Sequence, residues 1–155
     1  GLATSDDGLH FTRLPEPVFF PENDSLKIFE WEGGVEDPRL VESEDGTYFM
    51  TYTAYDGTTA RLCLATSKDL LTWKKHGLML GYGKHRDTWS KSGAIVCRRV
   101  GERLVATKIN GKYWMYWGDT DIFACTTPSS PMCFSFRKNE AASSAQRKSK
   151  VRRIW

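Results

Sequence analysis

Apolar and polar residues alternate along most of the first 126 residues with a period of two, which is the side-chain period of a β-strand. The clearest case is 47–55, where every second residue from Tyr48 to Ala54 is apolar or aromatic and the residues between them are apolar or amphipathic. Such a strand is typical of a sheet packed on both faces. The dipeptides Asp45-Gly46 and Asn110-Gly111 precede two of these strands and predict tight hairpins. We therefore expect an all-β fold, with no helix longer than two turns in 44–66.

The strand pattern repeats along the chain. Residues 2–11 match residues 64–73 at an offset of 62, and residues 45–50 match residues 110–115 at an offset of 65. Each unit contains a hairpin, a further strand that ends in Ala-Thr-Ser or a similar triplet, a polar turn and an aromatic closing strand. Repeats of this kind are typical of β-propeller blades, and a propeller needs about four or more blades to close. We therefore expect 1–126 to be an incomplete propeller of about two and a half blades.

Residues 127–155 depart from this pattern and are predicted to be a separate, disordered tail. The tail from Arg137 onward is rich in Ser, Ala, Lys and Arg and carries a charge of +6, whereas the whole chain carries +3, which leaves −3 for the rest. Such a composition buries little apolar surface. A basic tail can bind nucleic acid or anionic lipid, but a solvated end is the simpler interpretation. For this reason we expect no nucleic-acid partner. We also expect no membrane partner, because no apolar run is long enough to span a bilayer.

Cysteine and histidine residues do not form a recognisable metal motif. The four cysteines show no Cys-x-x-Cys spacing, and the three histidines do not lie at zinc-finger distances from them. We expect no metal and no cofactor. We expect four free thiols in a reducing compartment, with a disulfide between Cys125 and Cys133 as the alternative.

The segment 33–39 is the strongest candidate for chemistry. It runs Gly-Gly-Val-Glu-Asp-Pro-Arg, so that the carboxylate of Asp37 is flanked by Glu36 and Arg39. Pro38 fixes its own φ and restricts Asp37 to extended conformations, while the two glycines allow a sharp approach of the backbone. This predicts a stiff platform that holds a carboxylate beside a guanidinium, as proton transfer to a sugar oxygen requires. The alternative is an ordinary surface turn with an Asp–Arg pair.

This segment and three others together resemble glycoside hydrolase family 130, in truncated form. The other segments are 45–57, 60–62 and 64–73. The resemblance runs from about Leu2 to about Ile122 and fades after Ala124. It implies a partial five-bladed β-propeller that acts on β-mannosides, with a mannose-containing oligosaccharide as the partner. It also implies a bacterial protein of the cytoplasm or periplasm.

The resemblance also implies roles for individual residues. Asp37 would be the general acid, which protonates the glycosidic oxygen through a hydroxyl of the mannosyl unit, and Asp119 would be the catalytic base. The substrate-binding candidates are Glu36, Arg39, Tyr55, Asp56, Arg61, Lys91 and Ser92. Two of them have simpler alternatives, since Asp56 also begins an Asp-Gly turn and Lys91 could be an exposed strand-end lysine.

The residues around 117–119 decide which reaction we expect. Phosphorylases of the resembled family carry a basic pair where this chain has Gly118 and Asp119, and they have Lys-Asp in place of Lys91-Ser92. A carboxylate there would repel phosphate but could activate water, which favours an inverting hydrolase of β-1,2-linked mannosides. Such an enzyme holds its acid and base about 6.5–9.5 Å apart.

Three alternatives remain open at this stage. The first is a β-mannoside phosphorylase, which uses inorganic phosphate and releases mannose 1-phosphate. The second is another five-bladed glycosidase, active on arabinan or xylan. The third is a non-catalytic, carbohydrate-binding remnant. We expect little turnover from this chain alone, because absent blades would leave the site open to water.

Overall fold

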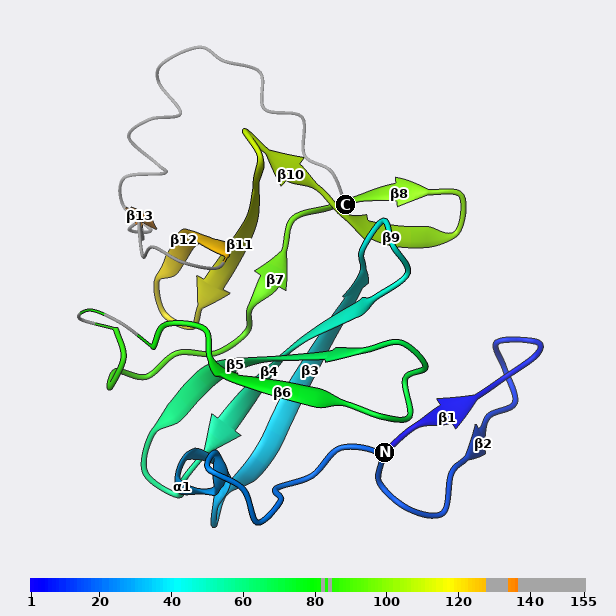
Figure 1. The fold of residues 1–155 in the computed structure, drawn as a ribbon, viewed down its shortest axis with the longest axis horizontal. Helices are drawn as coiled ribbons and strands as arrows, with labels where there is room; N and C mark the ends of the chain where they lie inside the picture. Colours follow the sequence, from blue (N-terminus) through cyan, green and yellow to red (C-terminus); the bar gives the residue numbers. More distant parts are fainter. Residues whose placement is uncertain (82, 84, 128–133, 137–155) are drawn as a thin grey trace.

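Short strands, mostly antiparallel, form nearly all of the regular secondary structure among the described residues, as the alternating pattern predicts (Figure 1). The computed structural model describes residues 1–81, 83, 85–127 and 134–136. One short helix, α1 (Lys27–Glu30), precedes the main sheet. The strands are β1 (Ala3–Thr4), β2 (Thr12–Arg13), β3 (Gly34–Glu42), β4 (Tyr48–Tyr55), β5 (Ala60–Ser67), β6 (Lys74–Leu78), β7 (Ala94–Ile95), β8 (Cys97–Val100), β9 (Arg103–Ala106), β10 (Lys108–Ile109), β11 (Lys112–Gly118), β12 (Ile122–Thr127) and β13 (Phe134–Phe136).

The described strands form three sheets. The strands β1 and β2 pair with each other, and the largest sheet has the order β6-β5-β4-β3-β9-β8. Its first four strands are antiparallel neighbours in chain order, as expected for one blade. In the other sheet β11 lies centrally, with β12 and then β13 on one side and both β7 and β10 on the other. The predominance of strands confirms the all-β prediction. Within the described residues the sheets do not close into a ring, so the partial propeller stays a prediction.

The largest sheet departs from a purely antiparallel, four-stranded blade. In sequence, the hairpin β8–β9 lies between β7 and β10, which both pair with β11. The hairpin itself pairs with the edge of β3 in the largest sheet, where Glu42 and Val105 are parallel partners. Arg103 donates to both carboxylate oxygens of Glu42, which fastens the hairpin there. The repeat unit, with its hairpin, further strand and closing strand, predicts four antiparallel strands in a blade. This prediction was wrong for the largest sheet, because the hairpin pairs with the edge of β3 that would otherwise be unpaired.

Both predicted hairpin turns are confirmed. Ile109 pairs with Lys112 across the two-residue loop Asn110-Gly111, in which φ is +53° and +74°. Positive φ at both positions is the geometry that matches the twist of a hairpin. The Asp45-Gly46 turn closes through a hydrogen bond of 2.7 Å from the Ser43 N–H to the Thr47 carbonyl. Strands β4 and β5 occupy most of 44–66, where no helix is present.

The sequence repeat at an offset of 62 is also a repeat of structure. In the first copy, Asp7 accepts hydrogen bonds from the Ser5 hydroxyl and from two backbone N–H groups that follow it. In the second copy, Asp69 accepts the corresponding bonds from the Ser67 hydroxyl and from two backbone N–H groups. The same local hydrogen bonding therefore closes both copies of the polar turn.

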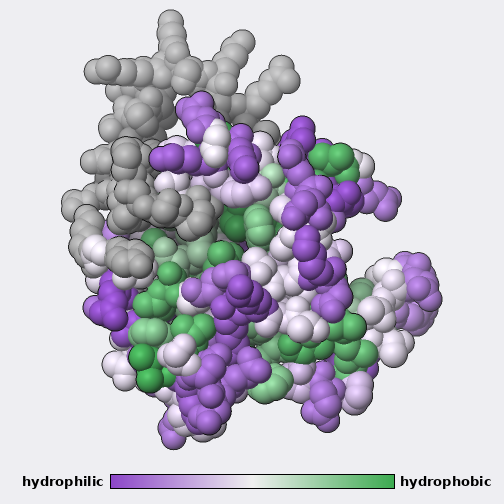
Figure 2. Space-filling view, viewed as in Figure 1, coloured by the Kyte–Doolittle hydropathy of each residue, from purple (hydrophilic) through white to green (hydrophobic). Residues whose placement is uncertain are grey.

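Strand β4 is buried on both faces, as its sequence predicts. Tyr52 and Thr51 point to opposite faces, and each side chain is about 1% exposed. One face packs in a core around Met50, Tyr52 and Ala65, and the other lies toward a core around Leu62 and Met115. Apolar side chains also reach the surface at several places among the hydrophilic ones (Figure 2). No helix among the described residues has the length and apolar character needed to cross a membrane.

The predicted boundary near residue 126 falls inside a strand. Strand β12 continues through Thr127, and β13 pairs with β12 beyond it. Residues 128–133 and 137–155 lie outside the described residues. The prediction of a disordered basic tail concerns mainly these residues and stays a prediction.

Thiol reactivity provides a test of the packing around β5. Cys63 is about 1% exposed and burial raises the pKa of its thiol to about 12, whereas Cys97 is only partly buried; both are free thiols. Because the thiolate is the reactive form, we expect alkylation at pH 8 to modify Cys97 at least about 100-fold faster than Cys63. Peptide mapping by mass spectrometry measures both rates. Equal rates in the folded protein would contradict the packing. The alternative of a disulfide between Cys125 and Cys133 stays a prediction, because Cys133 lies outside the described residues.

Candidate active site

Asp37 lies on a β-bulge in β3. The register between β3 and β4 shifts between Glu36 and Arg39, which leaves Asp37 and Pro38 without cross-strand partners. Asp37 has φ of +50°, so the prediction that Pro38 would hold it in an extended conformation was wrong. The residue at this bulge is left-handed, and aspartate tolerates that conformation better than most residues do. Backbone strain of this kind is found most often at functional sites.

The bulge exposes the carboxylate of Asp37 to solvent. Among the described residues, its side chain forms no hydrogen bond or ion pair, and neither does the guanidinium of Arg39. The expected Asp–Arg pair is therefore not formed. Glu36 pairs with Thr53 and Arg39 with Thr51 across the strands, so both project toward the face of the sheet that carries these threonines.

The segment that contains Lys91 packs on the same face. The Thr51 hydroxyl donates a hydrogen bond of 2.6 Å to the carbonyl of Gly93, which fixes the segment beside β4. Ser92 has φ of +57°, a second left-handed residue close to the bulge. The expected substrate-binding residues Glu36, Arg39 and Ser92 are thus on one side of the largest sheet.

The structure brings Lys91 and Asp119 together. The Lys91 ammonium lies 3.6 Å from the Asp119 carboxylate, with side chains 31% and 58% exposed. The Gly118 N–H donates to the Lys91 carbonyl at 3.0 Å, which aligns the two segments. The two residues are therefore neighbours in space although 28 positions separate them in sequence. Their contact also neutralises part of the positive charge that Lys91 could offer to an anion.

Asp56 and Arg61 form a second pair at the same end of the sheet. A guanidinium nitrogen of Arg61 lies 2.5 Å from the Asp56 carboxylate, and the side chains are 13% and 19% exposed, respectively. Arg61 also lies over the ring of Phe29, 5.4 Å from its centroid. The Asp56 carboxylate accepts the backbone N–H groups of Thr58 and Thr59 at 2.8 Å. Asp56 therefore begins the turn, which is the simpler of the two roles considered for it, and its carboxylate also holds Arg61.

The pH dependence of stability tests the Asp56–Arg61 pair. The Thr59 N–H above all, together with Arg61 and the Thr58 N–H, holds the pKa of Asp56 below its ordinary value of 3.8. The stabilisation is therefore fully present above the unfolded pKa and is lost as pH falls through the folded one. We expect Asp56→Asn to destabilise the protein by a constant amount above about pH 5 and by less at lower pH. Urea unfolding across pH measures this, with exposed Asp6→Asn as the control; a difference that does not depend on pH would contradict it.

Tyr55 is less available to a ligand than the sequence suggested. Its hydroxyl donates to the Gly57 carbonyl at 2.9 Å, and its ring lies against the backbone at Gly33, where a Cβ would come within 2.2 Å of Tyr55 Cδ1. Its ring also meets the edge of Trp89, at a centroid distance of 6.0 Å. Sequence reasoning missed Trp89 as a site residue, although its position two residues before Lys91 was a usable signal.

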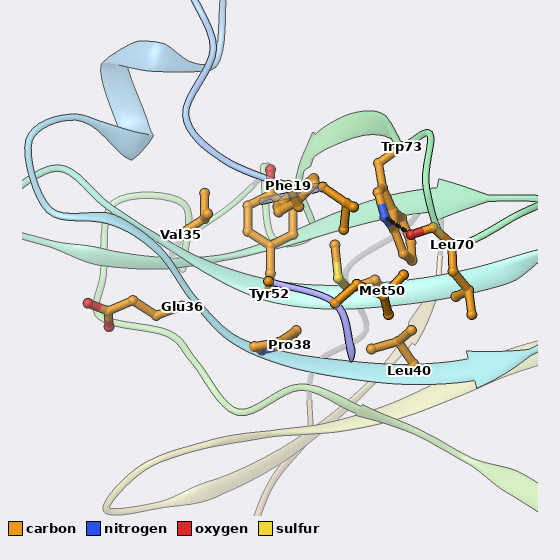
Figure 3. Close-up of a pocket in the computed structure, with 12 residues that line it drawn as sticks. Phe19, Val35, Glu36, Pro38, Leu40, Met50, Tyr52, Leu70 and Trp73 are labelled. Carbon is orange, nitrogen blue, oxygen red and sulfur yellow. Dashed lines mark hydrogen bonds between the residues drawn. The ribbon is translucent and has the colours of Figure 1, made fainter. Parts of the chain in front are cut away.

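A separate pocket of about 220 Å³ lies on the opposite face of β3 and β4 (Figure 3). Aromatic and aliphatic side chains line it, among them Phe19, Tyr52 and Trp73, whereas the carboxylate of Glu36 points away from this group. A wall of this chemistry offers a sugar few hydrogen bonds. Within the described part of the chain, no group of three or more His, Cys, Asp or Glu side chains could hold a metal ion.

Comparison with known proteins identifies the family. A sequence model of the Glyco_hydro_130 family, described as β-1,4-mannooligosaccharide phosphorylase, matches residues 1–147. The chain therefore belongs to glycoside hydrolase family 130, a family of glycoside phosphorylases and hydrolases. The match extends past Ala124, where we expected the resemblance to fade.

Two relatives of similar sequence are named as phosphorylases. A 1,2-β-oligomannan phosphorylase of Thermoanaerobacter sp. (strain X514) is 37% identical over 118 residues, which are 74% of this chain and 33% of that protein. A β-1,2-mannobiose phosphorylase of the same organism is 35% identical over 75% of this chain and 32% of its own length. The chain thus spans about a third of the length of these relatives.

Two solved structures share the fold. A glycosyl hydrolase from Bacteroides ovatus is 44% identical, with a TM-score of 0.79 over 86% of this chain and 38% of that one. The other was solved in work on family 130 glycoside hydrolases that target β-1,2-mannosidic linkages in Candida mannan. It is 42% identical, with a TM-score of 0.79 over 89% of this chain and 39% of that one.

Proposed function

We propose that this chain carries part of the active site of an enzyme that cleaves β-1,2-mannosidic bonds by phosphorolysis. The observation that carries the proposal is the exposed carboxylate of Asp37, held at positive φ on a bulge, in a chain that belongs to family 130. The two named phosphorylases support β-1,2-linked mannose and phosphate as the substrates, and they favour phosphorolysis over our first expectation of hydrolysis. We further propose that the two larger sheets are blades of a five-bladed propeller whose remaining blades this chain lacks.

The residues take complementary parts in the proposed reaction. Asp37 supplies the proton that the glycosidic oxygen gains, by way of a hydroxyl of the mannosyl unit, as the C1–O bond breaks. A phosphate oxygen forms the new bond to C1 from the opposite side, so that the anomeric configuration inverts. Arg39 and Lys91, on one side of the sheet, supply positive charge that attracts the phosphate. Arg61 pairs with Ala54 and lies over Phe29, on the face opposite Thr51, so its part is to hold Asp56 at this end of the sheet.

Hydrolysis is the second candidate, and the contact between Lys91 and Asp119 favours it. A carboxylate 3.6 Å from the ammonium weakens the attraction of that site for phosphate, and the same carboxylate can take a proton from water. The likeness to a structure from work on β-1,2-mannoside hydrolases supports this alternative. In that case Asp119 is the base and water takes the place of phosphate.

The product formed from β-1,2-mannobiose distinguishes the candidates. The complete enzyme that carries this sequence is incubated with the disaccharide, with and without phosphate, and the products are separated by chromatography. We expect mannose 1-phosphate, formed only when phosphate is present. Release of mannose alone, slowed by Asp119→Asn, would replace phosphorolysis by hydrolysis. Binding of the disaccharide without either product would indicate the carbohydrate-binding alternative.

A further inference from the structure

Trp89 presents an indole ring at the edge of the candidate site. Its side chain is 50% exposed although it is the largest apolar side chain in its segment. Its ring meets the edge of Tyr55 at a centroid distance of 6.0 Å, and the Lys91 ammonium lies 5.9 Å from its ring centroid. The indole is thus in contact with two residues already assigned to the site while one part of it remains open.

The backbone on the C-terminal side of Trp89 is fastened to both large sheets. The Ser90 N–H donates to the Ala60 carbonyl at 2.9 Å, and the Ser90 hydroxyl accepts from the Leu62 N–H at 3.1 Å, which attaches the segment to β5. The next residue, Lys91, is attached to the end of β11 by its carbonyl. Ser90 is 3% exposed, so solvent does not compete for these bonds. A ligand that contacts Trp89 therefore meets a surface that is already ordered, which lowers the entropic cost of binding.

Trp89 also lines a hollow of about 370 Å³. The other lining residues are Trp117, Gly118, Asp119, Thr120, Asp121 and Phe123. This volume is within the range of small-ligand sites, which combine a mainly apolar lining with a few polar groups. Here flat aromatic surface lies beside the carboxylates of Asp119 and Asp121. A pyranose ring has the matching chemistry, with C–H groups on its faces and hydroxyls around its rim.

We propose that Trp89 is the stacking platform for a pyranose ring of the substrate, with Asp119 and Lys91 bonding to the hydroxyls at the ring edge. The inference rests on the proposed function and adds a residue that determines sugar binding. In a β-mannoside the hydrogens on C1, C3 and C5 form an apolar patch on one face, and the axial 2-hydroxyl points from the other. Stacking on the first face leaves the 2-hydroxyl free. Tyr55, packed against Gly33, supports the indole instead of stacking itself.

Binding of β-1,2-mannobiose to variants of the 155-residue chain tests the proposal. We expect Trp89→Ala to weaken binding by about tenfold or more and Trp89→Phe by much less, because an aromatic ring is retained. Trp31, 57% exposed beside α1, gives the matched control, and Trp31→Ala should leave affinity unchanged. Isothermal titration measures the affinities. Proton NMR of the sugar adds a second readout, since stacking shifts the C3 and C5 protons upfield and this shift should vanish in Trp89→Ala.

The outcomes separate this inference from the proposed function. If Trp89→Ala binds mannobiose as tightly as the wild type while Asp119→Ala does not, the platform is wrong and the function stands. If the wild type binds another disaccharide, such as cellobiose, but not mannobiose, and Trp89→Ala abolishes that binding, the platform stands and the mannoside assignment is wrong. Absence of binding to either sugar would overturn both. Equal unfolding midpoints for wild type and Trp89→Ala exclude a folding defect as the cause.

Discussion

Replacement of Asp37 by Asn is expected to lower the rate of β-mannoside cleavage by about 10²- to 10⁴-fold, the usual contribution of general acid catalysis. Asparagine keeps the shape of the side chain and tolerates positive φ, so the bulge between Glu36 and Arg39 should persist. Only the transferable proton is removed. Because the carboxylate has no partner among the described residues whose loss would disturb the fold, the variant should remain as stable as the wild type.

The measurement compares turnover and binding in the same variant. Turnover of β-1,2-mannobiose is followed in the complete enzyme that carries this sequence, and binding is measured in parallel. Affinity should change little, since the amide still accepts a hydrogen bond. Glu44→Gln, at the turn that follows the same strand, is the control and should leave the rate unchanged, because Glu44 is exposed and remote from the bulge. A near-normal rate for Asp37→Asn would remove Asp37 from the role of acid.

Local patterns predicted the strands and turns of this protein well. The period-two alternation of 47–55 and the turn dipeptides identify β4 and both hairpins, because those features depend on neighbouring residues only. The repeat at an offset of 62 predicted a polar turn in each copy, and the structure adds that Asp7 and Asp69 accept matching hydrogen bonds there. The transfer of the β8–β9 hairpin to β3 could not be predicted in this way, because pairing between distant strands has no local signature.

The site was predicted in part. The structure places Lys91 beside Asp119, both of which the family resemblance named as site residues, whereas their roles in the reaction stay predictions. The positive φ of Asp37 was not predicted, because a bulge depends on the register with β4 and the sequence of one strand does not specify that register. The unpaired state of Arg39 follows from the same bulge, which changes the directions of the side chains within 36–39.

A buried ionic network was missed altogether, although it connects α1 to the sheet. The Lys75 ammonium on β6 lies 2.6 Å from the Glu30 carboxylate, with side chains 5% and 1% exposed. The Tyr52 hydroxyl donates to the other oxygen of Glu30 at 2.8 Å, and Lys75 also donates to the Phe20 carbonyl. Because Glu30 and Lys75 are 45 residues apart in sequence, neither one signals the other.

Lys75→Met is expected to lower the free energy of unfolding by about 3–5 kcal/mol, the typical cost of leaving one member of a buried ion pair alone. Methionine fills the space of the lysine stem but leaves the Glu30 carboxylate without its countercharge. The control is Lys68→Met, which removes a pair with Asp45 whose side chains are 66% and 71% exposed. This exposed pair should contribute less than about 1 kcal/mol. Urea unfolding at pH 7 measures both changes, provided that the slope of free energy against urea stays constant.

The double variant Glu30→Gln/Lys75→Met separates the pair from its packing. Glutamine at position 30 can still accept the hydrogen bond from the Tyr52 hydroxyl. Because Lys75 is replaced as well, neither charge of the pair remains buried. We therefore expect the double variant to be less destabilised than the sum of the two single variants by about 2 kcal/mol or more, because residues in direct contact do not contribute additively. In Glu30→Gln the Lys75 ammonium keeps two nearby carboxylates, those of Glu22 at 3.7 Å and Asp24 at 4.0 Å, which partly balance its positive charge. This variant should therefore be the milder of the two single changes. Strict additivity would mean that the ion pair contributes nothing of its own and that packing alone attaches α1 to the sheet.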